Sequence, residues 1–128
     1  MKSNYKILMV DDDPNVTEIV KMVLADRFQT GSLLNPLEAL EHLKTNKYDL
    51  ILLDYFMPEM SGEEFTEEFR KFDQVTPIIL ITGYAEEDHP LELLDRMDIQ
   101  GYFDKTNDPE TLYINIVSLF NTLEIAKR

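Results

Sequence analysis

The sequence contains no cysteine and no long hydrophobic run. Without cysteine the chain forms neither disulfides nor thiolate metal sites, which fits a reducing compartment. No apolar run approaches the roughly 20 residues that a membrane-spanning helix needs. The N-terminal stretch MKSNYKILMV soon meets Asp11, which argues against a signal peptide. We therefore expect a soluble, cytoplasmic protein.

Basic residues are also scarce. The chain has 12 of them against 25 acidic residues, for a formal net charge of −13. Such a surface repels phosphate backbones, so we expect no nucleic-acid binding by this domain alone. It favours divalent metals, cationic ligands and basic protein patches instead. The length of 128 residues predicts a single domain over residues 1–128 with one core.

Short strand patterns alternate with helical ones along the chain, without a repeat or a linker. Periodicity and apolar runs predict strands at Tyr5–Val10, Gln29–Leu33, Leu50–Asp54, Pro77–Thr82 and Gly101–Lys105. Five strands alternating with five helices predict an α/β fold, a doubly wound parallel sheet with helices on both faces. In such folds the ligand site lies beyond the carboxyl ends of the strands.

Amphipathic helices are predicted after each strand, from apolar residues three and four apart. Asn35 is expected to cap the second helix, and Pro109 to open the last. The fourth helix should begin near Asp88, because a proline such as Pro90 is tolerated only in a first turn. The residues expected on the inner faces are Val16, Ile19, Val20, Val23 and Leu24; Leu37, Leu40 and Leu43; Phe65, Phe69 and Phe72; Leu91, Leu94 and Met97; and Leu112, Ile116, Leu119 and Leu123.

Four of the predicted strands end in polar or charged residues. These are Asp11, Asp12 and Asp13 after the first strand, Asp54 on the third, Thr82 on the fourth, and Asp104 and Lys105 on the fifth. Clustered carboxylates raise one another's pKa unless a cation intervenes. An all-oxygen ligand set favours Mg²⁺, with Mn²⁺ as its substitute. In this interpretation Asp54 is a nucleophile that forms an acyl phosphate, while Lys105 and Thr82 contact phosphoryl oxygens.

Several of these polar residues also have a simpler interpretation. Asp13 precedes Pro14, and we expect it to cap the first helix rather than bind metal. Asp104 and the isolated His42 and His89 are expected to face solvent.

The residues at these strand ends resemble the receiver domain of two-component response regulators, over essentially the whole chain. The matching segments are VDDDP (10–14), DYFMPEMSG (54–62), ITGYA (81–85) and GYFDK (101–105). The pattern D-x-x-M-P-x-M-x-G is the most specific of them. The resemblance implies a flavodoxin-like strand order of 2-1-3-4-5. It also implies a phosphoacceptor signalling domain, not an enzyme, that takes a phosphoryl group from a sensor histidine kinase or a phosphotransfer protein.

Carried over by position, the resemblance makes Asp54 the phosphoacceptor. Asp12 corresponds to the direct magnesium ligand, Asp11 to a ligand through water, and the Phe56 backbone carbonyl completes the protein's share of the metal ligands. Thr82 and Lys105 contact the phosphoryl group.

The resemblance also identifies a switch and a dimer surface. Tyr102 is the aromatic residue that moves inward when Thr82 shifts on phosphorylation. Many relatives dimerise through the face of the fourth helix, the fifth strand and the fifth helix, and this chain is a candidate for a homodimer of that kind.

One position near the predicted site departs from the family pattern, and two others bear on hydrolysis. Thr106 follows Lys105 where the family usually has a proline joined by a cis bond. We expect a trans Lys105–Thr106 peptide, because a cis bond to a residue other than proline costs about 2.5–4 kcal/mol. Phe56 and Tyr84, two residues past Asp54 and Thr82, are expected to flank the path of an attacking water and to slow self-dephosphorylation.

Three alternatives fit the sequence less well. A phosphohydrolase of the haloacid dehalogenase type needs a second acid two residues after its nucleophile, and that position is Phe56. A flavodoxin binds phosphate in a hydroxyl- and glycine-rich first loop, where three aspartates would repel it. A pseudo-receiver, acting only as an interaction module, normally lacks part of the acidic set, which is complete here.

Overall fold

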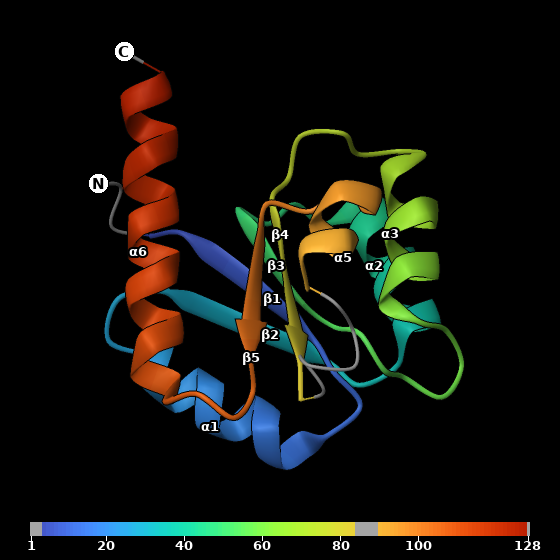
Figure 1. Ribbon diagram of the computed structural model, residues 1–128, viewed down its shortest axis with the longest axis horizontal. Helices are drawn as coiled ribbons and strands as arrows, with labels where there is room; N and C mark the ends of the chain where they lie inside the picture. The colour runs from blue at the N-terminus through green and yellow to red at the C-terminus, as the bar shows by residue number, and fades with distance from the viewer. Residues whose placement is uncertain (1–3, 84–89, 128) are drawn as a thin grey trace.

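A parallel sheet of five strands in the order β2-β1-β3-β4-β5 forms the centre of the protein (Figure 1). The computed structural model describes residues 4–83 and 90–127. The strands are β1 Lys6–Val10, β2 Gln29–Leu33, β3 Leu50–Asp54, β4 Ile78–Thr82 and β5 Gly101–Asp104. Within the described residues the helices are α1 Pro14–Leu24, α2 Pro36–Thr45, α3 Gly62–Arg70, α5 Pro90–Arg96 and α6 Pro109–Ala126. The predicted doubly wound α/β fold and its strand order are confirmed.

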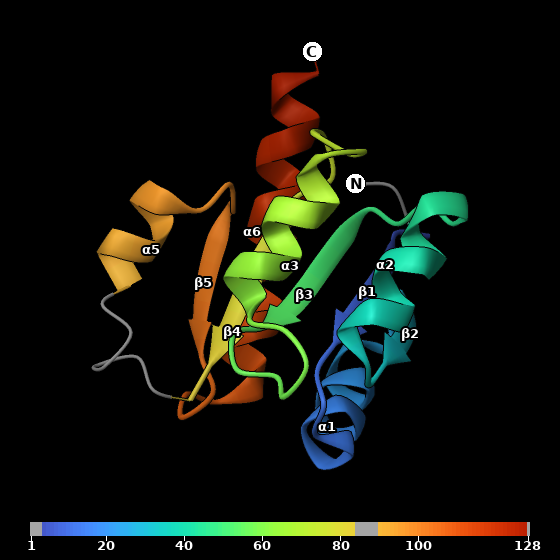
Figure 2. The same cartoon turned by 90° about the vertical axis from the view of Figure 1, so that its right-hand side faces the viewer.

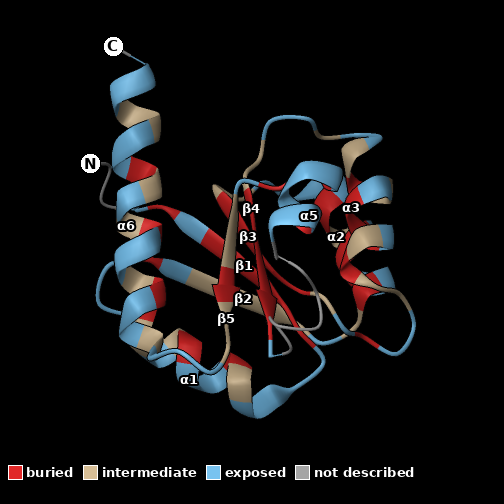
Figure 3. Cartoon of the chain, in the orientation of Figure 1, coloured by how far each residue is buried: buried red, intermediate tan, exposed pale blue. Residues whose placement is uncertain are grey.

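Helices cover both faces of the sheet, which is why the central strands are apolar on both sides. In β1, Leu8 and Val10 join the core beneath α2, α3 and α5, whereas Ile7 and Met9 join the core beneath α1 and α6. β3 and β4 alternate between the two cores in the same way. Figure 2 shows α2, α3 and α5 in front of the sheet, and Figure 3 shows the buried central strands between the two helical layers.

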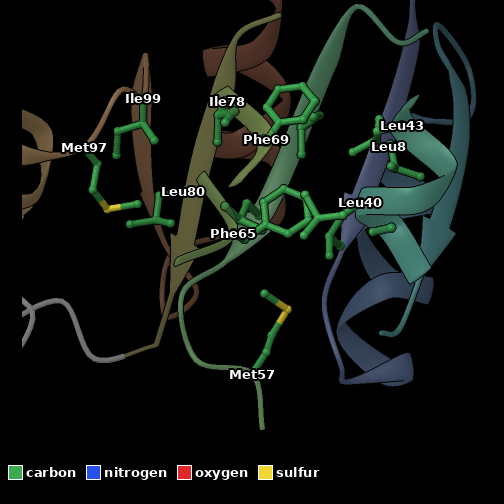
Figure 4. Packing of buried hydrophobic residues seen from close by; sticks show 14 of the residues in the cluster. Leu8, Leu40, Leu43, Met57, Phe65, Phe69, Ile78, Leu80, Met97 and Ile99 are labelled. Atoms are coloured by element: carbon green, nitrogen blue, oxygen red, sulfur yellow. The ribbon is translucent and has the colours of Figure 1, made fainter. Parts of the chain in front are cut away.

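Aromatic rings anchor both cores. Beneath α3, the rings of Phe65 and Phe69 lie over the sheet with centroids 6.2 Å apart (Figure 4). On the opposite face the ring of Tyr5 stacks on that of Phe120, with centroids 3.8 Å apart. Burying an aromatic side chain of this kind contributes about 1.5–3 kcal/mol, so these rings hold the helices firmly against the sheet.

The predicted helix starts agree with the structure where it describes them. Asn35 Oδ1 accepts the N–H groups of Leu37 and Glu38 at the start of α2. Pro109 opens α6 after Asp108, whose carboxylate accepts the Glu110 N–H at 2.9 Å. The predicted start of the fourth helix near Asp88 lies outside the described residues. No helix in the described part of the chain has the length and hydropathy to span a membrane.

In α2 and α5, some of the leucines predicted to face the core are exposed, whereas Leu40, Leu43 and Met97 are buried as predicted. Leu37 of α2 is half-exposed, and Leu91 of α5 is 79% exposed. The predictions for Leu37, Leu91 and Leu94 are wrong. Residues three apart lie about 60° from each other around a helix, so a row of leucines at this spacing gradually turns away from the core. Leu93 and Met97, four residues apart, face the core from α5 instead. The buried residues of α2 are Pro36, Ala39, Leu40 and Leu43.

Three other helices need smaller corrections. Ile19 is 51% exposed, because α1 turns Thr17, Val20 and Leu24 inward. Phe72 lies beyond the end of α3 and is partly exposed, with its ring against the edge of Phe69. In α6, the buried residues are Leu112, Ile116 and Phe120. Leu119 and Leu123 are only partly buried against this cluster.

Candidate functional site

The register of the sheet brings the predicted strand ends to one edge. Val10 lies beside Leu53, so Asp11 and Asp54 follow neighbouring positions of β1 and β3. Asp54 in turn lies beside Ile81, and Thr82 lies beside Asp104. β2 lies on one side of β1, and β3 lies on the other. The direction in which successive strands are added to the sheet therefore reverses between β1 and β3. Ligand sites of doubly wound folds form at such a point.

Lys105 links the two buried carboxylates at this edge. Its Nζ lies 3.1 Å from Asp54 Oδ1 and 3.1 Å from Asp11 Oδ2. Asp11 is fully buried and Asp54 is 4% exposed, whereas the Lys105 side chain retains contact with solvent. The position follows from the backbone, because the Lys105 N–H donates to the Thr82 carbonyl at 2.8 Å and extends the ladder past β5. The predicted pairing of Lys105 with Asp54 is thus present, and it includes Asp11.

A third carboxylate completes an oxygen cluster. One carboxylate oxygen from each of Asp11, Asp12 and Asp54 lies within 4.8 Å of the others, and Asp12 is exposed to solvent. Buried charges of one sign are costly unless they are paired or bind metal. An arrangement of two buried carboxylates and one solvent-facing carboxylate suits a hard cation that keeps part of its water shell.

The electrostatics of the site show that Lys105 alone does not neutralise it. The pKa of Asp54 is raised from 3.8 to about 7, first by burial and then by the charge of Asp11, while Lys105 acts in the opposite direction. For Lys105, burial lowers the pKa, but the carboxylates of Asp54 and Asp11 outweigh burial, so the net shift is upward. The ammonium therefore stays protonated and the site keeps an excess of negative charge.

Asp13 does not belong to the oxygen cluster. Its Oδ1 accepts the Asn15 N–H at 2.9 Å and caps α1, and its carbonyl accepts the Thr17 hydroxyl at 3.0 Å. The Asp13 N–H donates to Asp11 Oδ1 at 2.9 Å, which fixes the orientation of the Asp11 carboxylate. The predicted helix-capping role of Asp13 is confirmed, and the residue also positions Asp11.

The loop after Asp54 folds back tightly and requires glycine at its end. A Cβ on Gly62 would lie 3.0 Å from Tyr55 Cα and 3.1 Å from the Asp54 carbonyl oxygen. The Gly62 N–H donates to the Tyr55 carbonyl at 2.8 Å, and Ser61 forms a capping box with Glu64. The D-x-x-M-P-x-M-x-G pattern thus describes a loop whose close approach holds the end of β3 in place.

Of the remaining predicted site residues, the structure describes Thr82, Tyr102 and Phe56. Thr82 is fully buried at the end of β4, and Tyr102 is partly buried in register with Leu80. Phe56 is 49% exposed, with its ring against the edge of Tyr55. Tyr84 lies outside the described residues.

Two residues that were assigned to solvent take part in local structure. Asp104 is half-buried, and its Oδ1 accepts both the N–H and the hydroxyl of Thr106 at 2.8 Å. A proline at position 106 would lack this N–H, so the turn after Lys105 uses the threonine. His42 is half-buried at the surface, with Nε2 2.7 Å from the Tyr48 hydroxyl oxygen. His89 is outside the described residues, and the trans Lys105–Thr106 peptide stays a prediction.

Comparison with known proteins agrees with this geometry. The chain matches the response regulator receiver domain family over residues 7–117. It is 32% identical over 115 residues to the transcriptional regulatory protein SrrA of Staphylococcus aureus, covering 89% of this chain and 47% of SrrA. The response regulator TrrA from Thermotoga maritima, solved in complex with Mg²⁺-BeF, is 32% identical with a TM-score of 0.79, covering 90% of this chain and 98% of TrrA. A CheY-like receiver domain protein from Methanospirillum hungatei has a TM-score of 0.86 at 26% identity, covering 97% and 99% of the two chains.

The chain therefore belongs to the response regulator receiver domain family of two-component signalling. It spans about half the length of curated relatives such as SrrA, at 47%, and the probable transcriptional regulator ycf29 of Porphyra purpurea, at 56%.

Proposed function

We propose that Asp54 accepts a phosphoryl group from a sensor histidine kinase or a phosphotransfer protein. An oxygen of the Asp54 carboxylate forms the new bond to phosphorus, while the bond from phosphorus to the donor's imidazole nitrogen breaks. The nitrogen keeps the electron pair of that bond, and the product is an acyl phosphate on Asp54. The observation that carries this proposal is the pairing of Lys105 with Asp54 and Asp11 in an otherwise anionic, oxygen-lined site.

The residues present fit a bound Mg²⁺ or Mn²⁺. Asp12 would bind the ion directly, Asp11 through water, and Asp54 and the Phe56 carbonyl would complete the protein's ligands. Their carboxylates are close enough to share one cation, and two of the three are buried. When bound, the ion supplies positive charge that offsets the charge of the carboxylates and of the transferring phosphoryl group. The Mg²⁺-BeF complex of the related TrrA supports this assignment.

Lys105 and Thr82 would hold the phosphoryl group on its protein side. The Lys105 ammonium already lies in contact with Asp54 and needs only a small movement to reach a phosphoryl oxygen. Thr82 stands at the end of the adjacent strand and would donate a hydrogen bond from its hydroxyl. Preorganised donors of this kind stabilise charge that develops in the transition state.

Phosphorylation would then change the face formed by α5, β5 and α6. Movement of Thr82 toward the phosphoryl group would open space on the side of β4 where Leu80 and Tyr102 lie together, and the Tyr102 ring would fill it. Leu91 and Leu94 leave apolar surface exposed on α5. This surface supports a homodimer through the α5–β5–α6 face in the phosphorylated state.

The proposal also includes slow hydrolysis of the acyl phosphate on Asp54 by the protein itself. The Phe56 side chain is half-exposed on the loop after Asp54, and it has no group that would orient an attacking water. The same role for Tyr84, two residues after Thr82 in the sequence, stays a prediction.

Intact-mass measurement with acetyl phosphate tests the proposed function. The wild-type protein should gain one phosphoryl group with Mg²⁺ and none with chelator, and Asp54→Asn should gain none in either condition. Asp13→Asn serves as the control, because Asp13 caps α1 outside the oxygen cluster. Labelling that persists in Asp54→Asn, or in chelator, contradicts the proposal.

A further inference from the structure

A small cavity lies between α1, the end of β5 and the first turn of α6. Its volume is about 130 Å³. Figure 1 shows α1 and the start of α6 side by side beneath the end of β5. The floor is apolar and buried, made by Val20 of α1, Ile81 of β4, Phe103 of β5 and Leu112 of α6.

The mouth of the cavity is open to solvent and, unlike the floor, includes a polar side chain. Ile19, at 51% exposure, and the exposed Asn107 line this side. Lys105 contributes to the wall, so the cavity reaches the lysine that contacts Asp54 and Asp11. The site thus combines an apolar floor, one amide at the entrance and a wall shared with the proposed phosphoryl-transfer site.

We propose that this cavity binds a small uncharged aromatic molecule of about the size of phenol. Apolar cavities of about 150 Å³ stay dry and take up benzene, because water finds no polar partners in them. A ring would pack on the floor residues, and a single polar substituent would face Asn107 at the mouth. The floor is apolar, and burying an ionised group on it without a partner would be costly, so the ligand is neutral.

Occupancy of the cavity would act on the metal site through Lys105. A cation held by Asp12, Asp11 and Asp54 would repel the Lys105 ammonium and favour its withdrawal from the oxygens of Asp11 and Asp54. The cavity gives the lysine stem room to withdraw, and a bound ring removes that room. The ligand and Mg²⁺ therefore oppose each other, and each weakens the other by the same factor. This coupling rests on the proposed function, whereas the binding of the ring does not.

Methyl NMR with phenol, without metal or phosphoryl donor, tests the cavity. The methyl signals of Ile81 and Leu112 should shift with increasing phenol until the shifts saturate. The methyl signal of Met22 should not shift, because Met22 lies on the same helix as Val20 but is 76% exposed. Val16→Phe should abolish the shifts by filling the cavity, since Val16 lines it. Ile19→Phe, at the mouth, is a second blocking variant, and Met22→Phe is the control that keeps binding. Absence of saturation, or equal phenol affinity in all variants, overturns the proposal.

Titration with Mg²⁺ tests the coupling. Saturating phenol should raise the Mg²⁺ dissociation constant on the order of fivefold, and saturating Mg²⁺ should raise that of phenol equally. Val16→Phe should weaken Mg²⁺ binding without phenol, whereas Met22→Phe should not. A Mg²⁺ affinity that phenol leaves unchanged overturns the coupling. If the wild type binds no Mg²⁺ at all, the proposed function fails, and the metal-free phenol titration still decides the cavity.

Discussion

The Lys105 ammonium lies 3.1 Å from Asp54 Oδ1, and the same ammonium contacts Asp11. One positive charge is thereby shared between two buried carboxylates, with Asp12 close by. In the proposed function this imbalance suits two ligands: a divalent cation, which would bind the anionic oxygens, and a phosphoryl group, which the lysine would contact.

Removal of the lysine charge should destabilise the metal-free protein. Lys105→Met leaves two buried carboxylates without their partner, and we expect a loss of about 2–3 kcal/mol in the free energy of unfolding, measured with urea. Saturating Mg²⁺ should restore part of this loss. Lys71→Met is the matched control, because Lys71 pairs with Glu68 on the exposed surface and should change stability by less than about 0.5 kcal/mol. Equal losses in the two variants would contradict the assigned role.

Stability should depend on pH through Asp54. The pKa of Asp54 is about 7 in the folded protein and near 3.8 when unfolded, so the unfolded chain releases this proton at lower pH. The contribution of this group therefore makes the free energy of unfolding fall as pH rises between these values. Asp54→Asn removes the effect, and its stability relative to the wild type should increase by about 2–3 kcal/mol from about pH 5 to about pH 8 without metal. A difference that stays constant with pH would rule this out.

The lifetime of the acyl phosphate should depend on the side chain at position 56. Phe56→Asn introduces a group that can orient water, and we expect hydrolysis to accelerate on the order of tenfold or more. Phosphate release after removal of the donor measures the rate, with Phe72→Asn as a control at a partly exposed phenylalanine beyond α3. Tyr84→Ala tests the second predicted position. If neither Phe56→Asn nor Tyr84→Ala hastens hydrolysis, the aromatic pair does not protect the phosphate.

Beryllofluoride with Mg²⁺ should promote dimerisation through the α5–β5–α6 face. Sedimentation should show a larger species only with the phosphoryl mimic, and Leu91→Glu should prevent it, because Leu91 is exposed on α5. Val75→Glu is a control at an exposed apolar residue outside these elements. A mass and a Tyr102 environment that do not respond to beryllofluoride would count against the switch.

The sheet and the edge that carries the site were predictable from the sequence. Strands such as Leu50–Asp54 are buried on both faces, so their apolar runs gave the strand limits to within one residue. Parallel strands place their carboxyl ends at one edge, so the grouping of Asp11 with Asp54 and Lys105 followed from the fold.

Details that depend on side-chain direction and on distant partners were not predictable. The exposed side of Leu91 depends on the helical angle, which leucine spacing alone does not fix. The Arg96 guanidinium donates to both Glu63 carboxylate oxygens and joins α5 to α3, and no local pattern pairs residues so far apart in the chain. Asp104 accepts two hydrogen bonds from Thr106 because of a local turn, which the family motif does not describe.

The identity of the phosphorylated residue is the most direct test of the account. Borohydride reduces an acyl phosphate on aspartate to homoserine, and peptide mass spectrometry locates the modified position. After treatment with acetyl phosphate and Mg²⁺, homoserine should replace Asp54 and leave Asp11, Asp12 and Asp13 unchanged. Homoserine at any of those three positions, or at none, would contradict the central claim that Asp54 accepts the phosphoryl group.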